Sequence, residues 1–237
     1  MMFGHSCAAC DVRNQALCCA LSDAELAPLA SFGVLRHLAR GEILIHAGDP
    51  APICANIQRG LMKISHINPA GQEVIVGLLW PGDFVGASLG AAADKPAPHD
   101  VVALTPVTLC VFPKRRMEQA LTEHPPMERA LLGRTLAELD QVRLRLTRLA
   151  RATALARVAG FIREIARRLP PDDGDTVTSI ELPLSRGEMA DLLGLTIETV
   201  SRQMTQLKNA GVIGLPGGRQ VAIHDPDALA EAAEDYL

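Results

Sequence analysis

A heptad repeat in the middle of the chain limits its possible folds more than any other feature. Apolar and threonine residues alternate at intervals of three and four over three heptads. This period predicts one long helix with a single seam along its side. We interpret the seam as the interface of a homodimer, although packing within one chain would satisfy the same pattern. The seam consists of Leu132, Thr135, Leu139, Val142, Leu146, Leu149 and Thr153, of which the leucines and Val142 are the expected dimerisation residues.

The surroundings of the seam divide a chain of 237 residues into four parts. Hydrophobic residues make up 48% and charged residues 21%, which is typical of a globular protein with a sizeable core. A Pro-Pro-Asp-Asp-Gly run at 170–174 ends the helical region and serves as a linker. The parts we expect are a cysteine-rich segment at 1–20, a β region at 21–112, a helical region at 113–169 and a second domain at 170–237.

The β region contains short apolar runs separated by turns rich in glycine and proline. Runs with turns every eight to twelve residues indicate a sandwich or a barrel. The stretch 91–100, which contains two prolines, is expected to be a loop. The expected strands cover residues 42–45, 60–64, 74–79 and 101–112.

The second domain has the spacing of a helix-turn-helix followed by a hairpin. Ser185 and Glu188 form a capping box that opens one helix, and Gly194 suits the turn that ends it. Thr196 is a candidate N-cap for a second helix that extends to about Asn209. Residues 212–223, with a Pro-Gly-Gly turn, are expected to form a β-hairpin that acts as a wing.

Three polar residues on the second helix are candidates for reading bases. Arg202 can donate two hydrogen bonds to guanine, Glu198 can accept one from cytosine, and Ser201 can contact a base or a phosphate. Glu198 and Arg202 are four residues apart and therefore share one face of the helix. A surface ion pair between them, which would contribute little stability, is the alternative.

The distribution of charge argues against DNA binding by this domain alone. Residues 171–237 hold four Lys or Arg and twelve Asp or Glu, and the whole chain has a net charge of −4. Such a surface attracts phosphates weakly. Residues 111–170, with thirteen basic and six acidic residues, are therefore expected to supply part of the attraction.

Cysteines cluster at the start of the chain, where four of the six fall within nineteen residues. Neither a signal peptide nor a membrane-spanning run is visible, so we expect a cytoplasmic protein, in which clustered thiols bind metal or do redox chemistry. The spacing of Cys7, Cys10 and Cys18 suits zinc or an iron–sulfur cluster. Cys54, Cys110 and His5 are the candidates for a fourth ligand, although a lone cysteine in an apolar strand, such as Cys110, is more often a buried hydrophobic residue. Cys19 is adjacent to Cys18, and consecutive residues of an extended chain point in opposite directions, so Cys19 is a candidate only in place of Cys18.

Taken together, these motifs resemble the cAMP receptor protein superfamily, and specifically its oxygen-sensing FNR branch in α-proteobacteria. The resemblance covers nearly the whole chain and is most specific in the stretch Leu193-Gly194-Leu195-Thr196-Ile197-Glu198-Thr199-Val200-Ser201-Arg202. It implies an α+β fold with an N-terminal jelly-roll barrel of the cyclic-nucleotide-binding type, a long dimerisation helix and a C-terminal winged helix-turn-helix. The DNA-contacting residues it implies are Ser185, Thr196, Glu198, Thr199, Ser201 and Arg202.

The resemblance also implies a cofactor and partners. It implies a [4Fe-4S] cluster held by Cys7, Cys10, Cys18 and Cys110, and a dimer that binds palindromic TTGAT-like operators until oxygen degrades the cluster. RNA polymerase is the implied protein partner. A cyclic nucleotide is not expected, because Gly86 is followed by Ala87-Ser88, and the later region at His99-Asp100-Val101 lacks the phosphate-binding arginine of the cAMP branch.

Three other functions remain as alternatives. A regulator of the same fold could sense nitric oxide through haem, or general redox state, but the cysteine cluster favours the iron–sulfur sensor. An iron–sulfur electron carrier would not need the helix-turn-helix. No paired carboxylates, activated nucleophile or phosphate-binding loop stands out, so we do not expect an enzyme.

Overall fold

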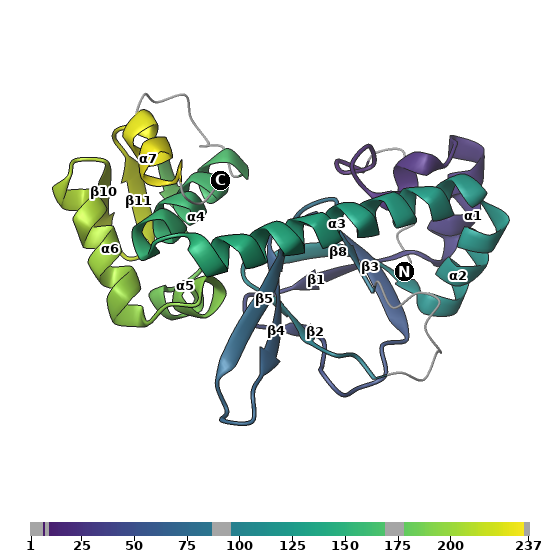
Figure 1. Ribbon diagram of the computed structural model, residues 1–237. Helices are drawn as coiled ribbons and strands as arrows, with labels where there is room; N and C mark the ends of the chain where they lie inside the picture. Colours follow the sequence, from purple (N-terminus) through teal and green to yellow (C-terminus); the bar gives the residue numbers. More distant parts are fainter. Residues whose placement is uncertain (1–6, 8–9, 87–95, 169–177, 235–237) are drawn as a thin grey trace. The chain divides into compact units, whose positions relative to one another are not determined.

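The computed structural model describes residues 7, 10–86, 96–168 and 178–234, which form two compact units, 1–139 and 140–237 (Figure 1). The expected linker at 170–174, the candidate ligand His5, Ala87-Ser88 and part of the expected loop 91–100 lie outside the described residues. Among the described residues, no helix is both long and apolar enough to span a membrane.

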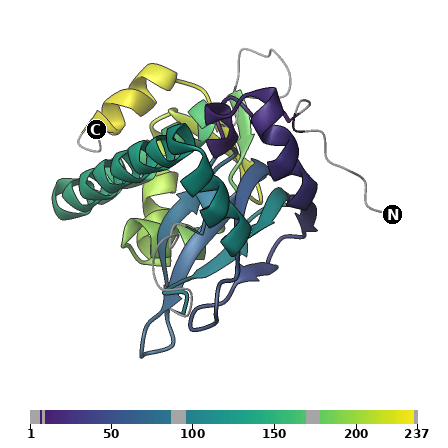
Figure 2. The same ribbon diagram turned by 90° about the vertical axis from the view of Figure 1, so that its right-hand side faces the viewer.

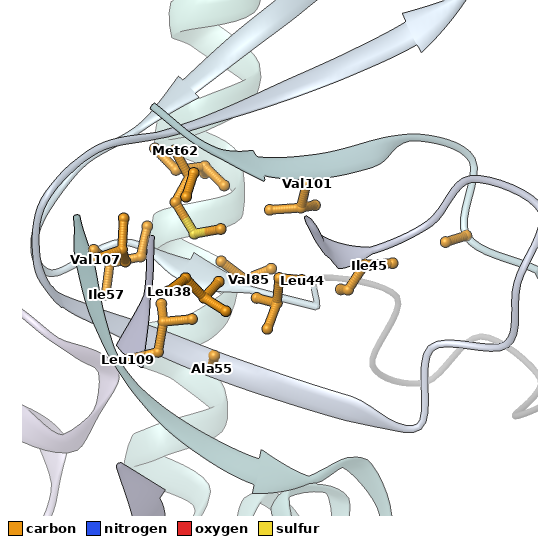
Figure 3. Packing of buried hydrophobic residues seen from close by; sticks show 13 residues of the cluster. Leu38, Leu44, Ile45, Ala55, Ile57, Met62, Val85, Val101, Val107 and Leu109 are labelled. Atoms are coloured by element: carbon orange, nitrogen blue, oxygen red, sulfur yellow. The ribbon is translucent and has the colours of Figure 1, made fainter. Parts of the chain in front are cut away.

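Two antiparallel four-stranded sheets form the first unit, as the sequence predicted for a sandwich. Their inner faces pack together around a core of aliphatic side chains, which point toward one another in Figure 3. One sheet has the order β1 (Val34–Leu38), β8 (Val107–Pro113), β3 (Ile53–Arg59) and β6 (Phe84–Val85). The other has the order β2 (Ile43–Ile45), β7 (Asp100–Ala103), β4 (Met62–Ile67) and β5 (Glu73–Leu79).

Three details of the β region differ from the expectations. Residues 101–112 are not one strand, because a turn that includes Pro106 separates β7 from β8. Strands β1, β3 and β6 were not predicted. The region also begins with a helix, α1 (Asp23–Phe32), although Pro28 lies inside it, and a short 3-10 helix, η2 (Leu17–Ala20), precedes it in the cysteine-rich segment. Figure 2 shows α1 beside the strands, where Leu26 and Leu29 are buried.

The helical region consists of three helices. They are α2 (Lys114–Glu123), α3 (Pro125–Arg151) and α4 (Ala154–Arg168). The predicted seam lies on α3 but is shorter than expected. Thr153, its last position, follows the end of α3, and its Oγ1 accepts a hydrogen bond of 3.2 Å from the Ala156 N–H at the start of α4.

The second unit contains the predicted helix-turn-helix. Ser185 caps α5 (Arg186–Leu193), Gly194 is left-handed at φ 62°, and Thr196 caps α6 (Ile197–Asn209). The wing is β10 (Ile213–Gly217) and β11 (Gln220–Ile223). Two further elements were not predicted: β9 (Thr178–Glu181), which pairs with β11, and α7 (Pro226–Ala232).

Candidate metal centre and nucleic-acid interface

The cysteine site lies on the outer face of the β1-β8-β3-β6 sheet. Alternate residues of a strand point to opposite faces. In β3, Ala55 and Ile57 belong to the core between the sheets, whereas Cys54 belongs to a second cluster on the other face. In β8, Leu109 faces the inner core and Cys110 the outer cluster.

The N-terminal segment covers this outer face and brings three more thiols to it. Cys18, in η2, is buried beside Cys110, whereas Cys19 is exposed. Cys7 and Cys10 are partly exposed, and the Cys10 N–H donates to the Cys7 carbonyl at 3.4 Å. Asp11 holds the segment to β3 through an ion pair with Arg59, at 2.5 Å. Cys18, and not Cys19, therefore lines the site.

Cys7, Cys10, Cys18 and Cys110 line one cavity, as the resemblance required of the ligands. In the part of the chain that the structure describes, no three His, Cys, Asp or Glu side chains converge closely enough to hold a single metal ion. The volume between the thiols is about 20 Å³, room for about one water. Four cysteine thiols are the donor set that an iron–sulfur cluster takes, and two of them, on Cys7 and Cys10, are partly exposed.

Burial favours the protonated form of three of these thiols, those of Cys7, Cys18 and Cys110, in the metal-free chain. Burial, followed by the charges of the neighbouring thiols, raises the pKa of Cys18 to about 11 and that of Cys110 to about 12. The pKa of Cys7 is raised too, for the same two reasons. Because metals bind thiolates, a metal at this site must displace protons.

Cys54 is a third buried thiol, beside Cys18 and Cys110, but it does not line the cavity. Its Sγ donates to the carbonyl of Phe112 at 3.7 Å. Burial is the main cause that raises its pKa to about 12, with a smaller contribution from the charge of Glu118. This environment is that of a packed hydrophobic residue.

Two amide side chains of β3 also line the cavity, and the sequence analysis missed both. Asn56 Nδ2 donates to Cys18 Sγ at 3.6 Å, and Gln58 Nε2 donates to Cys10 Sγ at 3.7 Å. The signal was the alternation of Cys54, Asn56 and Gln58 on one face of a strand.

The second candidate site is the exposed face of α6. Glu198, Ser201 and Arg202 are exposed, as expected, whereas Val200 is buried. Hydrogen bonds from its own backbone N–H and then from the Thr196 hydroxyl lower the pKa of Glu198, so the carboxylate is ionised and can accept a hydrogen bond from cytosine.

The remaining predicted DNA-contacting residues hold the helix ends. Ser185 Oγ accepts from the Glu188 N–H, and Thr196 Oγ1 accepts from the Thr199 N–H, both at 3.2 Å. The exposed face of α6 also continues beyond Arg202 in residues that the sequence analysis did not select. Their helical spacing from Ser201 and Arg202 was the available signal. These residues are Thr205, Gln206 and Asn209.

The charge of the second unit is less acidic than the segment 171–237 suggested. The compact unit 140–237 includes the end of α3 and all of α4, and it holds twelve basic and fourteen acidic residues. Arg148, Arg163, Arg167 and Arg168 line one groove between α3 and α4. Eight of the thirteen basic residues of the stretch 111–170, which was expected to help attract phosphates, thus belong to the same unit as the helix-turn-helix.

The seam on α3 leaves apolar side chains in solvent. Four of the five predicted dimerisation residues are more than 40% exposed, and Leu136, not selected from the sequence, is 54% exposed. Leu149 is only partly exposed, and its Cδ2 lies near Gly194 in the helix-turn-helix turn. The exposed residues are Leu132, Leu136, Leu139, Val142 and Leu146.

The residues that argued against cAMP are only partly described. Asp100 accepts a hydrogen bond from the Ala47 N–H at 2.9 Å and lies 3.8 Å from His46. Asp100 thus supplies a carboxylate in the region where the cAMP branch has its phosphate-binding arginine. That no cyclic nucleotide binds stays a prediction.

Comparison with known proteins gives consistent matches over the whole chain. The Crp-like helix-turn-helix domain matches residues 156–232, and the cyclic nucleotide-binding domain matches residues 35–124. A probable transcriptional activator of Rhizobium leguminosarum is 38% identical, over 94% of this chain and 91% of its own. The transcriptional activator protein FnrL of Cereibacter sphaeroides is 36% identical, over 98% and 93%.

The fold is similarly matched by solved structures. That of FixK2 from Bradyrhizobium japonicum superposes with a TM-score of 0.73 at 26% identity, over 84% of this chain and 96% of that one.

Proposed function

Because this chain belongs to the Crp/Fnr family of transcription regulators, we propose that it is an oxygen-responsive activator with a [4Fe-4S] cluster on Cys7, Cys10, Cys18 and Cys110. The observation that carries the proposal is the cavity that these four cysteines line together, although they come from separate parts of the chain. A cluster binds each thiolate to a different iron, so its ligands need to surround a volume rather than meet at one ion.

When bound, the cluster supplies a charged, oxygen-labile crosslink between the N-terminal segment and β8. Cys18 and Cys110 would give up their thiol protons to bind iron, and the same cluster would hold the segment that carries Cys7 and Cys10 to the sheet. α1 and α2 pack in the same apolar cluster as Cys18 and Cys110, and α3 begins two residues after α2 ends. The site thus adjoins the base of the helix that carries the seam.

The seam is the proposed readout of the cluster. Two copies of α3 would bury Leu132, Leu136, Leu139, Val142 and Leu146 against one another. A ligand that binds the dimeric state preferentially raises the population of dimers. Loss of the cluster in oxygen would remove that preference.

Dimerisation determines DNA binding because each subunit supplies one α6. A dimer can place two recognition helices in successive major grooves of a palindromic operator, with Glu198, Ser201 and Arg202 toward the bases. RNA polymerase is the proposed partner at the promoter.

The proposal is tested by DNA binding in the presence and absence of oxygen. Fluorescence anisotropy would compare a palindromic TTGAT duplex with a scrambled duplex at one fixed salt concentration. Anaerobic protein should prefer the palindrome, and exposure to air should abolish the preference. Equal affinity for the two duplexes would contradict sequence-specific binding, and unchanged affinity in air would contradict oxygen sensing.

A further inference from the structure

We propose that Asn56 and Gln58 set the lifetime of the cluster in oxygen by donating hydrogen bonds to the sulfurs of two of its ligands. The inference rests on the proposed function, because it concerns the cluster on the four cysteines. It goes further by assigning a role to two residues of β3 that are not ligands.

The first support is geometric. Asn56 lies opposite Cys110 in the β3–β8 register, and its Nδ2 reaches Cys18 Sγ at 3.6 Å. Asn56 therefore stands between two of the proposed ligands. Gln58, two residues along the same face of β3, reaches Cys10 Sγ at 3.7 Å. Together the two amides donate to one buried ligand, Cys18, and to one partly exposed ligand, Cys10.

The second support is the burial of Asn56. The residue is 2% exposed, and apolar side chains, among them Val12, Ala16 and Phe112, line the cavity with it. Asn56 Oδ1 is also buried and has no hydrogen-bond partner among the residues that the structure describes. A buried amide with one unsatisfied oxygen destabilises a fold, and asparagine is a poor strand former. A leucine at this position would stabilise the fold more than asparagine does. We therefore expect the amide to have a function other than stabilising the fold.

The function that we assign to the amide is to donate a hydrogen bond to a negatively charged sulfur. A neutral thiol accepts a hydrogen bond weakly, whereas a thiolate bound to iron is a strong acceptor because it is charged. Hydrogen bonds to the sulfurs of an iron–sulfur cluster withdraw electron density and raise its reduction potential. Asn56 and Gln58 therefore make the cluster harder to oxidise, so that it is destroyed more slowly in oxygen.

The experiment replaces each amide with a side chain of similar size that cannot donate. The variants are Asn56→Leu and Gln58→Leu. The matched control is Gln119→Leu, because Gln119 is exposed on α2, where its amide donates a hydrogen bond to Glu123. Each full-length protein is loaded anaerobically with iron and sulfide. The decay of its visible absorbance is then followed after mixing with air-saturated buffer, and the thermal unfolding of the metal-free form is measured in parallel.

The expected result distinguishes an effect on the lifetime of the cluster from an effect on the stability of the fold. Asn56→Leu and Gln58→Leu should each accelerate the decay by about tenfold, at the lower end of typical effects of residues behind metal ligands. The control should match wild type. Metal-free Asn56→Leu should unfold at the wild-type temperature or higher, because its buried unsatisfied oxygen is gone.

Each other outcome contradicts the inference in a recognisable way. Wild-type decay rates in both variants would overturn the inference and leave the proposed function intact. Faster decay with an equal loss of metal-free stability would assign the amides a structural role. If Asn56→Leu does not take up iron, Gln58→Leu decides by the same criterion. If the wild type itself forms no chromophore, the proposed function fails, and this inference fails with it.

Discussion

The two candidate sites are assembled in opposite ways. The cysteine site is buried and joins the N-terminal segment to strands β3 and β8, which lie far from it in sequence. The reading face of α6 is exposed and comes from one helix whose ends are capped within a few residues. A site formed by residues that are close in sequence can be predicted from their spacing along the chain. A site formed by residues far apart in sequence depends on tertiary packing, which that spacing does not reveal. The two sites should therefore respond differently to substitution.

The largest expected effect is the loss of one ligand from the buried site. Cys110→Ser should abolish the broad visible absorbance of anaerobically purified protein, because a hydroxyl binds iron poorly in place of a thiolate. Cys54→Ser is the matched control, since Cys54 is equally buried on the same sheet face but does not line the cavity. Full iron content in Cys110→Ser would remove this residue from the ligand set.

The next effect concerns the seam that would connect the two sites. Leu146→Glu should weaken dimerisation by at least about 3 kcal/mol, because each of two leucines contributes about 1.5–3 kcal/mol when buried. Thr147→Glu, on the neighbouring exposed position of α3, is the control. Sedimentation equilibrium of anaerobic protein measures both. An unchanged dimer in Leu146→Glu would place the interface elsewhere.

Substitution on α6 should have a smaller and purely local effect. Arg202→Ala should weaken binding to the palindromic operator by about 1–3 kcal/mol and leave iron content unchanged. Glu198→Ala should behave in the same way. If either variant binds the operator and the scrambled duplex with wild-type affinities, that residue does not read bases.

The smallest effect is a pH dependence confined to the buried site. The pKa of Cys54 is raised from 9.0 in the unfolded chain to about 12, so its thiol stabilises the fold below pH 9 and this contribution is lost as the pH rises toward 12. At pH 10 the loss is on the order of 1 kcal/mol for one thiol. The unfolding free energy of metal-free Cys54→Ser should therefore decline less between pH 9 and 10 than that of wild type. The unfolding free energies would be measured by denaturant titration at each pH. An equal decline with pH in the two proteins would mean that Cys54 ionises as readily in the folded state as in the unfolded chain.

These two sites also explain which parts of the structure the sequence could predict. The helix-turn-helix was predicted almost residue by residue, because Ser185, Gly194 and Thr196 act through neighbours in sequence. Cys110 was different, since an apolar strand around a cysteine is equally compatible with a core residue, and only resemblance indicated a ligand. Asn56 and Gln58 were missed because β3 itself was not predicted.

Errors in element boundaries have similar causes. Residues 101–112 have the apolar composition of one strand, but Pro106 has no N–H to donate to a ladder, and the chain turns there between β7, which pairs with β4, and β8, which pairs with β3. The break after α3 contains neither glycine nor proline, so the pattern continued through it to Thr153. Arg157 explains part of this break, because its guanidinium donates to the carbonyls of Leu149 and Ala152, which would otherwise lack partners at the helix end.

The central claim is that the four cysteines hold an iron–sulfur cluster, and the most direct test is chemical analysis. Protein purified without oxygen would be assayed for iron, acid-labile sulfide and zinc per chain. The account predicts about four iron and four sulfide per chain and no zinc, with the iron lost after exposure to air. Stoichiometric zinc without sulfide would contradict it, because a single structural metal that is stable in air cannot report oxygen.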